Sequence, residues 1–250
     1  MEVRGKHIWL VGASAGIGAA LAKALADAGA TLTLSARNAE MLAQLAATCA
    51  GPTPRVLPLD VTDAASIAAA WKVLAAEALP DMVIYNAGTY EPLPATQFDL
   101  KKIEQMVDVN FNGALRVLAH VIPAFVARDS GHIALVGSVA GYRGLPGAMG
   151  YGASKAALIH LAENLRADFA RTKIGVTIIN PGFVKTQLTA KNDFHMPAMV
   201  SPEFAANAIM RGFRRGDFEI HFPHRFTRVL KFLRLLPSGV YFRLLTVAKF

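Results

Sequence analysis

The chain has 250 residues, of which 53% are apolar, and a formal net charge of +8 at pH 7. This length and apolar content suit a single α/β domain with one buried core. A single cysteine, Cys49, excludes an intrachain disulfide, and no apolar run is long enough for a signal peptide or a membrane span, so we expect a cytoplasmic protein.

Short apolar runs alternate with longer segments that have the composition of helices through most of the chain. The apolar runs predict strands at residues 8–11, 31–35, 55–59, 82–85, 132–136, 175–179 and 218–222. The intervening segments predict helices at residues 16–28, 39–48, 64–78, 99–128, 151–171 and 202–214, with Pro123 as a candidate break in the fourth. This alternation predicts a doubly wound, Rossmann-type parallel sheet of about seven strands with helices on both faces. We expect one catalytic domain over residues 1–222 and an extension over residues 223–250 that is not an independent domain.

The connection after the first predicted strand is rich in glycine. Residues 12–18 read Gly-Ala-Ser-Ala-Gly-Ile-Gly, and an Ala- and Leu-rich helix follows. Glycines allow a tight turn and a close approach of the backbone to a phosphate, and a helix N-terminus offers free N–H groups and a positive dipole end. The segment therefore favours a nucleotide site, with a tight connection that binds nothing as the alternative.

Tyr151 and Lys155 stand four residues apart in a predicted helix, and Ser138 lies thirteen residues before Tyr151. Side chains at this spacing share one face of a helix. A neighbouring ammonium group favours the phenolate, so Lys155 would bring the pKa of Tyr151, normally about 10, toward neutrality. Ser138 would then hold a carbonyl or hydroxyl oxygen beside the phenol. Taken alone, the pair is more often a surface Lys beside a half-buried Tyr.

Taken together, these segments resemble the short-chain dehydrogenase/reductase family. The matching motifs stand in the family's order: Gly12-x-x-x-Gly16-Ile17-Gly18, Asp60, Asn86-Ala87-Gly88, Asn110, Ser138, Tyr151-x-x-x-Lys155 and Pro181-Gly182-x-x-x-Thr186. The match covers about residues 7–222, and one departure is Val11, where the family usually has Thr or Ser. The motifs also fall at the carboxyl ends of predicted strands, where parallel sheets bind ligands.

The resemblance implies hydride transfer between a nicotinamide and a carbonyl or secondary alcohol. Tyr151 would be the general acid–base, Lys155 would tune it and hold the nicotinamide ribose, and Ser138 would orient the substrate oxygen. Asn110 would hold a water in the proton relay. The cofactor-binding positions that the resemblance implies are Gly12, Ser14, Gly16, Ile17, Gly18, Arg37, Asp60, Val61, Asn86, Ala87, Gly88, Tyr151, Lys155, Pro181, Gly182, Val184 and Thr186. No metal is expected.

The end of the second predicted strand favours NADP(H) over NAD(H). In relatives that bind NAD, an acidic residue there accepts hydrogen bonds from ribose hydroxyls, whereas this chain has Arg37 and no carboxylate in residues 35–38. A guanidinium suits a 2′-phosphate, and Ser14 would add a hydrogen bond. The alternative is that Arg37 is only a solvated side chain. Asp60 resembles the family's adenine contact, with an N-cap of the next helix as its alternative.

The positive charge is concentrated in the C-terminal part of the chain. Residues 211–250 contain nine Lys or Arg and two Asp or Glu, so the remainder is nearly neutral and gives no support to nucleic-acid binding. On a helical wheel, apolar residues gather on one side and basic residues largely on the other: Phe226, Val229, Leu230, Phe232, Leu233 and Leu236 against Arg228, Lys231 and Arg234. Such a helix suits an anionic membrane surface, or it packs its apolar face on the domain or on a second subunit.

We therefore expect an NADP(H)-dependent oxidoreductase that acts on a small, apolar carbonyl or alcohol substrate. One alternative is a reductase of carrier-bound 3-oxoacyl groups, with the basic tail docking an acidic carrier protein. Another is a nucleotide-sensing or scaffold protein without turnover. By resemblance, we expect a homodimer or homotetramer formed through residues 99–128 and 151–171. The tail adds a candidate contact with the membrane surface, and His195 is a weak candidate for substrate contact.

Overall fold

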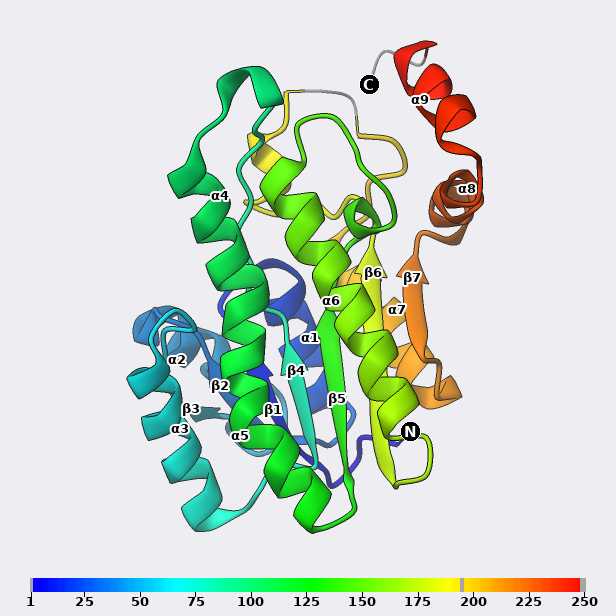
Figure 1. Cartoon of the computed structure of the whole chain (residues 1–250). Helices are drawn as coiled ribbons and strands as arrows, with labels where there is room; N and C mark the ends of the chain where they lie inside the picture. The colour runs from blue at the N-terminus through cyan, green and yellow to red at the C-terminus, as the bar shows by residue number, and fades with distance from the viewer. Residues whose placement is uncertain (1, 194–195, 248–250) are drawn as a thin grey trace.

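The computed structural model describes residues 2–193 and 196–247, which form a seven-stranded parallel sheet with helices on both faces (Figure 1). The strand order is β3-β2-β1-β4-β5-β6-β7. The strands are β1 (His7–Val11), β2 (Thr31–Ser35), β3 (Arg55–Val56), β4 (Met82–Tyr85), β5 (Gly131–Val136), β6 (Ile174–Pro181) and β7 (Glu219–Phe222). The doubly wound sheet predicted from the sequence is confirmed.

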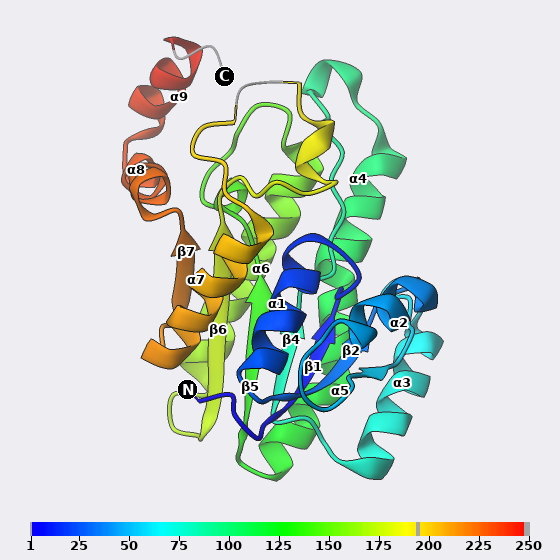
Figure 2. The ribbon, with the colours of Figure 1, turned by 180° about the vertical axis from the view of Figure 1, so that it is seen from behind.

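Each face of the sheet has its own hydrophobic layer. Helices α1 (Gly16–Asp27), α2 (Ala39–Ala47) and α7 (Pro202–Arg215) cover the face seen in Figure 2. Helices α3 (Ala64–Glu77), α4 (Leu100–Val107), α5 (Gly113–Ala127) and α6 (Met149–Asp168) cover the face seen in Figure 1. Side chains alternate along a strand, so Ile8 and Leu10 of β1 enter the first layer while Trp9 and Val11 enter the second. Burial on both faces explains why the strands are continuously apolar.

Strand β3 is shorter than predicted, because it ends at Val56 rather than at residue 59. The chain nevertheless continues alongside β2. The N–H of Leu57 donates to the carbonyl of Leu34 (2.9 Å), and that of Leu59 donates to the carbonyl of Ala36 (3.1 Å). Pro58 has no N–H group to donate, and β3 lies at the edge of the sheet.

The predicted helix over residues 99–128 is interrupted at a different place from the one expected. The interruption is a π-helical turn at Asp108–Asn112 between α4 and α5, whereas α5 runs through Pro123. The break expected at Pro123 is therefore wrong. Pro123 is exposed, and water can satisfy the carbonyl group that a proline leaves without its helical partner. Residues 100–127 are long and apolar enough to cross a bilayer, but here α4 packs on α6 and α5 on α3.

The C-terminal tail forms α8 (His224–Arg234) and α9 (Ser238–Val247), which follow β7 and lie beyond that edge of the sheet (Figures 1 and 2). The apolar face predicted for this segment is divided. Phe226 and Leu230 pack against the core, whereas Val229 and Phe232 remain exposed. The alternative in which this face packs on the domain therefore holds for Phe226 and Leu230 but not for Val229 and Phe232.

Candidate active site

A pocket of about 540 Å³ opens at the carboxyl ends of the strands. All the site residues predicted from the sequence line it except Gly18 and Asn110, which lie just behind its wall. The sheet therefore brings together motifs that are far apart in the chain. Among the described residues, no group of three or more His, Cys, Asp or Glu side chains is arranged to hold a metal ion.

The glycine-rich turn packs directly against the end of β4. A Cβ atom at Gly12 would collide with the backbone of Ala87, and one at Gly18 would collide with the carbonyl oxygen of Gly12. Asn86 completes this packing, because its side-chain Nδ2 donates to the carbonyl oxygen of Gly12 (2.6 Å). Glycine is thus required here for close packing of backbone on backbone. Ser14 lines the pocket, and its hydroxyl has no hydrogen-bond partner among the described residues.

Thr186 faces this turn across the pocket. A Cβ atom at Gly16 would lie 2.9 Å from Cγ2 of Thr186. The N–H of Thr186 donates to the hydroxyl of Thr189 (3.0 Å), which in turn donates to the carbonyl of Val184 (2.7 Å). The loop after β6 is therefore folded onto itself where it borders the pocket.

Arg37 projects from the end of β2 with its guanidinium unengaged. It is exposed, lines the pocket, and has no hydrogen bond or ion pair within the described part of the chain. Asn38 rather than Arg37 caps α2, because its side chain accepts a hydrogen bond from the N–H of Met41 (2.9 Å). A cation without an internal partner at this position is free to bind an anion from solution.

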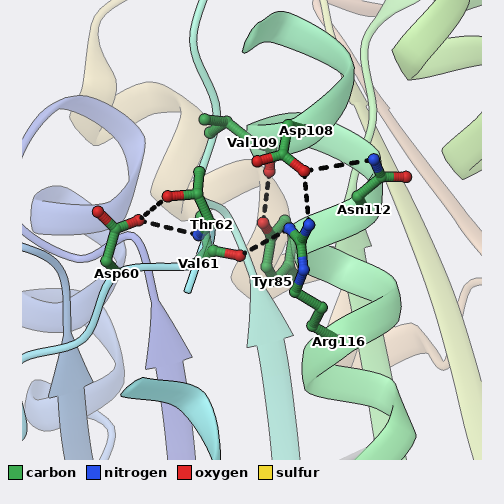
Figure 3. Close-up of polar contacts among 8 residues, drawn as sticks. All are labelled: Asp60, Val61, Thr62, Tyr85, Asp108, Val109, Asn112 and Arg116. Carbon is green, nitrogen blue, oxygen red and sulfur yellow. Dashed lines mark hydrogen bonds and ion pairs between the residues drawn. The ribbon is translucent and has the colours of Figure 1, made fainter. Parts of the chain in front are cut away.

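Asp60 lines the pocket beside the start of α3, but it does not cap that helix. Asp63 is the cap and accepts from the N–H of Ala65 (2.9 Å), so the N-cap alternative for Asp60 is wrong. One carboxylate oxygen of Asp60 instead accepts from the N–H (2.9 Å) and the hydroxyl (2.8 Å) of Thr62 (Figure 3). The hydrogen bond from the Thr62 backbone is the main reason that the pKa of Asp60 lies below its usual value.

Lys155 is a buried cation that has no acidic partner among the described residues. Its side chain, on α6, is 3% exposed, and Nζ donates to the carbonyl oxygen of Val136 (2.8 Å). Nζ lies 5.7 Å from the centre of the Tyr151 ring. Burial lowers the pKa of Lys155 to about 8. Strongly shifted groups in a pocket are characteristic of functional sites.

Burial raises the pKa of the Tyr151 phenol, and a hydrogen bond with Ser138 opposes that rise. The expected lowering by Lys155 is therefore not found in this structure. Two features explain the difference: desolvation disfavours the phenolate, and Lys155 directs its N–H groups at the carbonyl of Val136. The phenol of Tyr151 is consequently neutral at physiological pH.

Asn110 has a side chain that is fully engaged with the protein. It is completely buried; Oδ1 accepts from the N–H of Thr89 (2.7 Å), and Nδ2 donates to the carbonyl of Thr89 (3.0 Å) and to Ser154 Oγ (2.9 Å). Asn110 thus fixes the loop after β4 against α6. Gly88, in the same loop, lies close to both side chains: a Cβ atom there would come within 3.3 Å of Asn110 Oδ1 and 3.5 Å of Lys155 Nζ.

The π-helical turn that carries Asn110 is tied to the sheet. Figure 3 shows Tyr85, which donates its hydroxyl to the carbonyl of Val109 (2.5 Å). Arg116 joins the carbonyl of Val61 (3.2 Å) to the carboxylate of Asp108 (2.7 Å) in the same view. Asn112, which had no assigned role in the sequence, donates to that carboxylate (3.3 Å). These contacts hold in place the helical turn from which Asn110 reaches the loop after β4.

Around Tyr151 the pocket borders residues that the sequence did not single out. The ring of Tyr90 meets that of Tyr151 edge-on, with centroids 4.9 Å apart, and its hydroxyl donates to Asn192 Oδ1 (2.7 Å). Lys191 forms an ion pair with Glu91 and donates to the carbonyl of Tyr90 (3.0 Å). These contacts join two loops that are about a hundred positions apart in the chain. The signal in the sequence that could have indicated these loops is their place after the motifs Asn86-Ala87-Gly88 and Pro181-Gly182. The pocket residues not predicted from the sequence include Thr89, Gln105, Gln187, Leu188 and Lys191.

Comparison with known proteins agrees with this geometry. A family model described as short chain dehydrogenase matches residues 6–196. An uncharacterized oxidoreductase of Myxococcus xanthus is 37% identical over 235 residues, which cover 93% of each chain. A short-chain dehydrogenase from Sphingobium yanoikuyae, solved in complex with NADPH, is 29% identical with a TM-score of 0.80 and covers 87% of this chain and 88% of that one.

A second solved structure shows the same fold with the other nicotinamide cofactor. It is a short chain dehydrogenase/reductase from Burkholderia phymatum in complex with NAD, 21% identical with a TM-score of 0.84, covering 92% of this chain and 93% of that one. At this identity the likeness concerns the fold alone. The family model and the Myxococcus relative both extend over most of the chain, and the pocket carries the motifs in register. The chain belongs to the short-chain dehydrogenase family of oxidoreductases.

Proposed function

We propose that the protein is an NADP(H)-dependent oxidoreductase that interconverts a carbonyl and a secondary alcohol, with Tyr151 as general acid–base. The observation that carries this proposal is the meeting of Tyr151, Ser138 and buried Lys155 in one pocket with the glycine-rich turn. His195, the weaker candidate for substrate contact, lies outside the described residues.

The residues of the pocket fit a nicotinamide dinucleotide phosphate. The turn over residues 12–18 presents backbone at the start of α1, where a pyrophosphate is favoured. Arg37 and Ser14 offer unengaged donors for a 2′-phosphate, and Asp60 keeps one carboxylate oxygen free of internal hydrogen bonds. When bound, the nicotinamide supplies or takes the hydride. The NADPH complex of the Sphingobium relative supports this choice of cofactor.

The chain's own residues would supply the proton. Tyr151 donates its phenolic proton to the carbonyl oxygen in reduction and removes the hydroxyl proton in oxidation. The hydroxyl of Ser138 orients that oxygen. Lys155, charged below a pKa of about 8, would hold the nicotinamide ribose, as the family resemblance implies. The raised pKa of Tyr151 keeps its phenol protonated at neutral pH, which is the form that proton donation in reduction requires.

An apolar substrate is supported by the surroundings of Tyr151. Tyr90 stands edge-on to it, and Leu188 lines the same pocket. By family resemblance, the protein would assemble as a homodimer or homotetramer through α5 and α6, where Leu115 of α5 is exposed. We place it in the cytoplasm, with access to a membrane surface considered below.

The test is the substitution Tyr151→Phe, which removes the proton donor and keeps the ring. Turnover of apolar ketones with NADPH should fall by roughly 10²–10⁴-fold, the usual contribution of a general acid–base. NADPH binding, followed by its fluorescence, should be retained. Tyr241→Phe is the matched control, because its hydroxyl donates to the carbonyl of Gly144 (2.8 Å) outside the pocket. Equal turnover in both variants would refute the mechanism, and turnover of carrier-bound 3-oxoacyl groups alone would replace the substrate class.

A further inference from the structure

The C-terminal tail exposes large apolar side chains that the domain leaves uncovered. On α8 these are Val229, Phe232 and Leu235, which are 56%, 63% and 80% exposed. On α9 they are Val240, Phe242 and Leu244. We call these six residues the tail surface. Six large exposed apolar residues within one short segment mark a site of interaction rather than ordinary surface.

Basic side chains lie between the apolar residues of the tail surface. With about 100° per residue, Arg225 and Arg228 lie within the same sector of α8, about 120° wide, as Val229, Phe232 and Leu235, so the basic and apolar sides are less separate than the sequence predicted. Both arginines are exposed, and neither has a hydrogen bond or ion pair within residues 2–193 and 196–247. The outward face of α8 is therefore a mixture of aromatic, aliphatic and guanidinium groups.

Contacts with the domain hold the tail helices in place. Arg143, in the loop before α6, donates to the carbonyls of Leu233 (3.0 Å) and Leu236 (2.6 Å) at the end of α8. Its guanidinium also lies 4.1 Å from the centre of the Tyr241 ring on α9. Tyr241, which is buried, donates its hydroxyl to the carbonyl of Gly144 (2.8 Å). The exposed residues are thus displayed by anchored helices.

Negative charge is missing from the tail surface. Residues 220–250 contain six Lys or Arg and no Asp or Glu. The nearest acid in sequence, Glu219, is occupied by Lys231 (2.6 Å), Tyr142 (2.5 Å) and Asn180 (2.9 Å). The tail therefore carries an excess of positive charge, which favours a negatively charged partner.

We propose that the tail surface docks on an anionic lipid membrane. The headgroup region of an anionic bilayer accepts apolar side chains and guanidinium groups together, and it offers the negative charge that this basic segment lacks. A second copy of the chain fits poorly, because a twofold contact would set this basic surface against itself. An anionic bilayer satisfies both the charge and the apolar area.

Docking would also orient the pocket. In Figures 1 and 2 the tail helices lie at the same end of the molecule as the described parts of the loop after β6, residues 182–193 and 196–200, several of which border the pocket. The mouth of the pocket would then lie close to the lipid. This placement suits the apolar substrate proposed above, but docking itself does not depend on that function.

The test is co-sedimentation of the full chain with vesicles of phosphatidylcholine, with and without phosphatidylglycerol. The protein should bind the anionic vesicles at low salt and be released by high salt. Val229→Asp should abolish this binding. Val126→Asp is the matched control, since Val126 is 53% exposed on α5, and this variant should bind like the unmodified protein. Absence of binding to anionic vesicles, or equal loss in both variants, would overturn the proposal.

A second pair of variants tests the charges. Replacing both Arg225 and Arg228 by Gln should weaken vesicle binding about 30-fold. Each basic residue near an anionic surface contributes about 1 kcal/mol, which corresponds to about fivefold in affinity. Replacing the exposed Lys23 and Lys72 by Gln removes the same charge from α1 and α3 and should have little effect. NADPH binding and thermal unfolding of all variants confirm folding. A change in oligomeric mass with Val229→Asp, or capture of an acidic carrier protein without vesicle binding, would replace the membrane by that partner.

Discussion

The pocket and the C-terminal tail use the same kind of side chain in opposite ways, as Lys155 and Lys231 illustrate. Lys231 pairs with the carboxylate of Glu219 (2.6 Å) and helps to hold α8 on the domain. Lys155 is 3% exposed, and within the described part of the chain its ammonium group has one hydrogen-bond partner, a backbone carbonyl. A protein stabilises a structural cation with an anion, so an ammonium that is buried without one indicates a role beyond stability.

Burial of the Lys155 ammonium group lowers the free energy of unfolding. Lowering the pKa of Lys155 from 10.5 to about 8 corresponds to a penalty of about 3 kcal/mol for keeping it charged in the folded protein. The unfolded chain binds this proton more tightly. The penalty is therefore complete below pH 8 and disappears as the pH rises toward 10.5.

Lys155→Met should sharpen the comparison most strongly. We expect ketone reduction to fall by roughly 10–10²-fold, because a charged hydrogen-bond donor to the nicotinamide ribose, worth about 1.5–3 kcal/mol, is lost. We also expect the free energy of unfolding at pH 7 to stay the same or rise, because a buried unpaired charge is removed. Activity assays and chemical denaturation measure the two effects.

Lys231→Met is the matched control for that experiment. It leaves Glu219 without its cation, so it should lower the free energy of unfolding while turnover of a water-soluble ketone is retained. If Lys231→Met abolished turnover and Lys155→Met did not, the assignment of a functional and a structural lysine would be reversed.

Glu219 provides a smaller test of how the tail is anchored. Burial acts to raise its pKa, but hydrogen bonds from Lys231, Tyr142 and Asn180 outweigh it, and the pKa lies below the usual value. A carboxyl group with a depressed folded pKa contributes stability above its unfolded pKa, and that contribution is lost as the pH falls through the folded value. Glu219→Gln should therefore lower the free energy of unfolding at pH 7 by about 1–3 kcal/mol. The variant should then lose less stability than the unmodified protein when the pH is lowered.

Denaturant titrations at neutral and acid pH measure this effect. Glu163→Gln is the control, because Glu163 has a 44% exposed side chain and only a weak contact with His160 (3.9 Å). Identical acid sensitivity in the Glu219→Gln and Glu163→Gln variants would show that the contacts of Glu219 do not stabilise the tail.

The two regions also differ in what the sequence could predict. The pocket was predictable because its residues belong to motifs at strand ends, and a parallel sheet gathers those ends together. Asn110 was found as a motif residue, but its contacts with Thr89 and Ser154 depend on a π-helical turn. Local sequence placed the interruption at Pro123 instead, since the hydroxyl of Tyr85 that binds this turn comes from a distant strand.

Contacts across long chain separations explain the remaining differences. The pKa of Tyr151 depends on burial by neighbouring loops, which the spacing of Tyr151 and Lys155 does not reveal. In the tail, a helical wheel showed an apolar side but not how much of it β7 and the loop before α6 would cover. Arg143, in that loop, donates to the carbonyls of Leu233 and Leu236 and so holds the end of α8 on the domain.

Arg37 gives the smallest of the expected effects. Arg37→Ala should weaken NADPH binding by about tenfold, or about 1.4 kcal/mol, and leave NADH binding nearly unchanged, because only the 2′-phosphate is lost as a partner. Fluorescence titrations with each nucleotide measure this change. A parallel loss for both nucleotides would mean that Arg37 supports the pocket without reading the phosphate.

The most direct measurement of the central claim is a titration of the unmodified protein with NADPH and NADH, followed by the fluorescence of the reduced nicotinamide. The proposed NADP(H)-dependent reductase should bind NADPH at least about tenfold more tightly than NADH. Tighter binding of NADH would contradict the assignment of Arg37, and failure to bind either nucleotide would contradict the proposed oxidoreductase function itself.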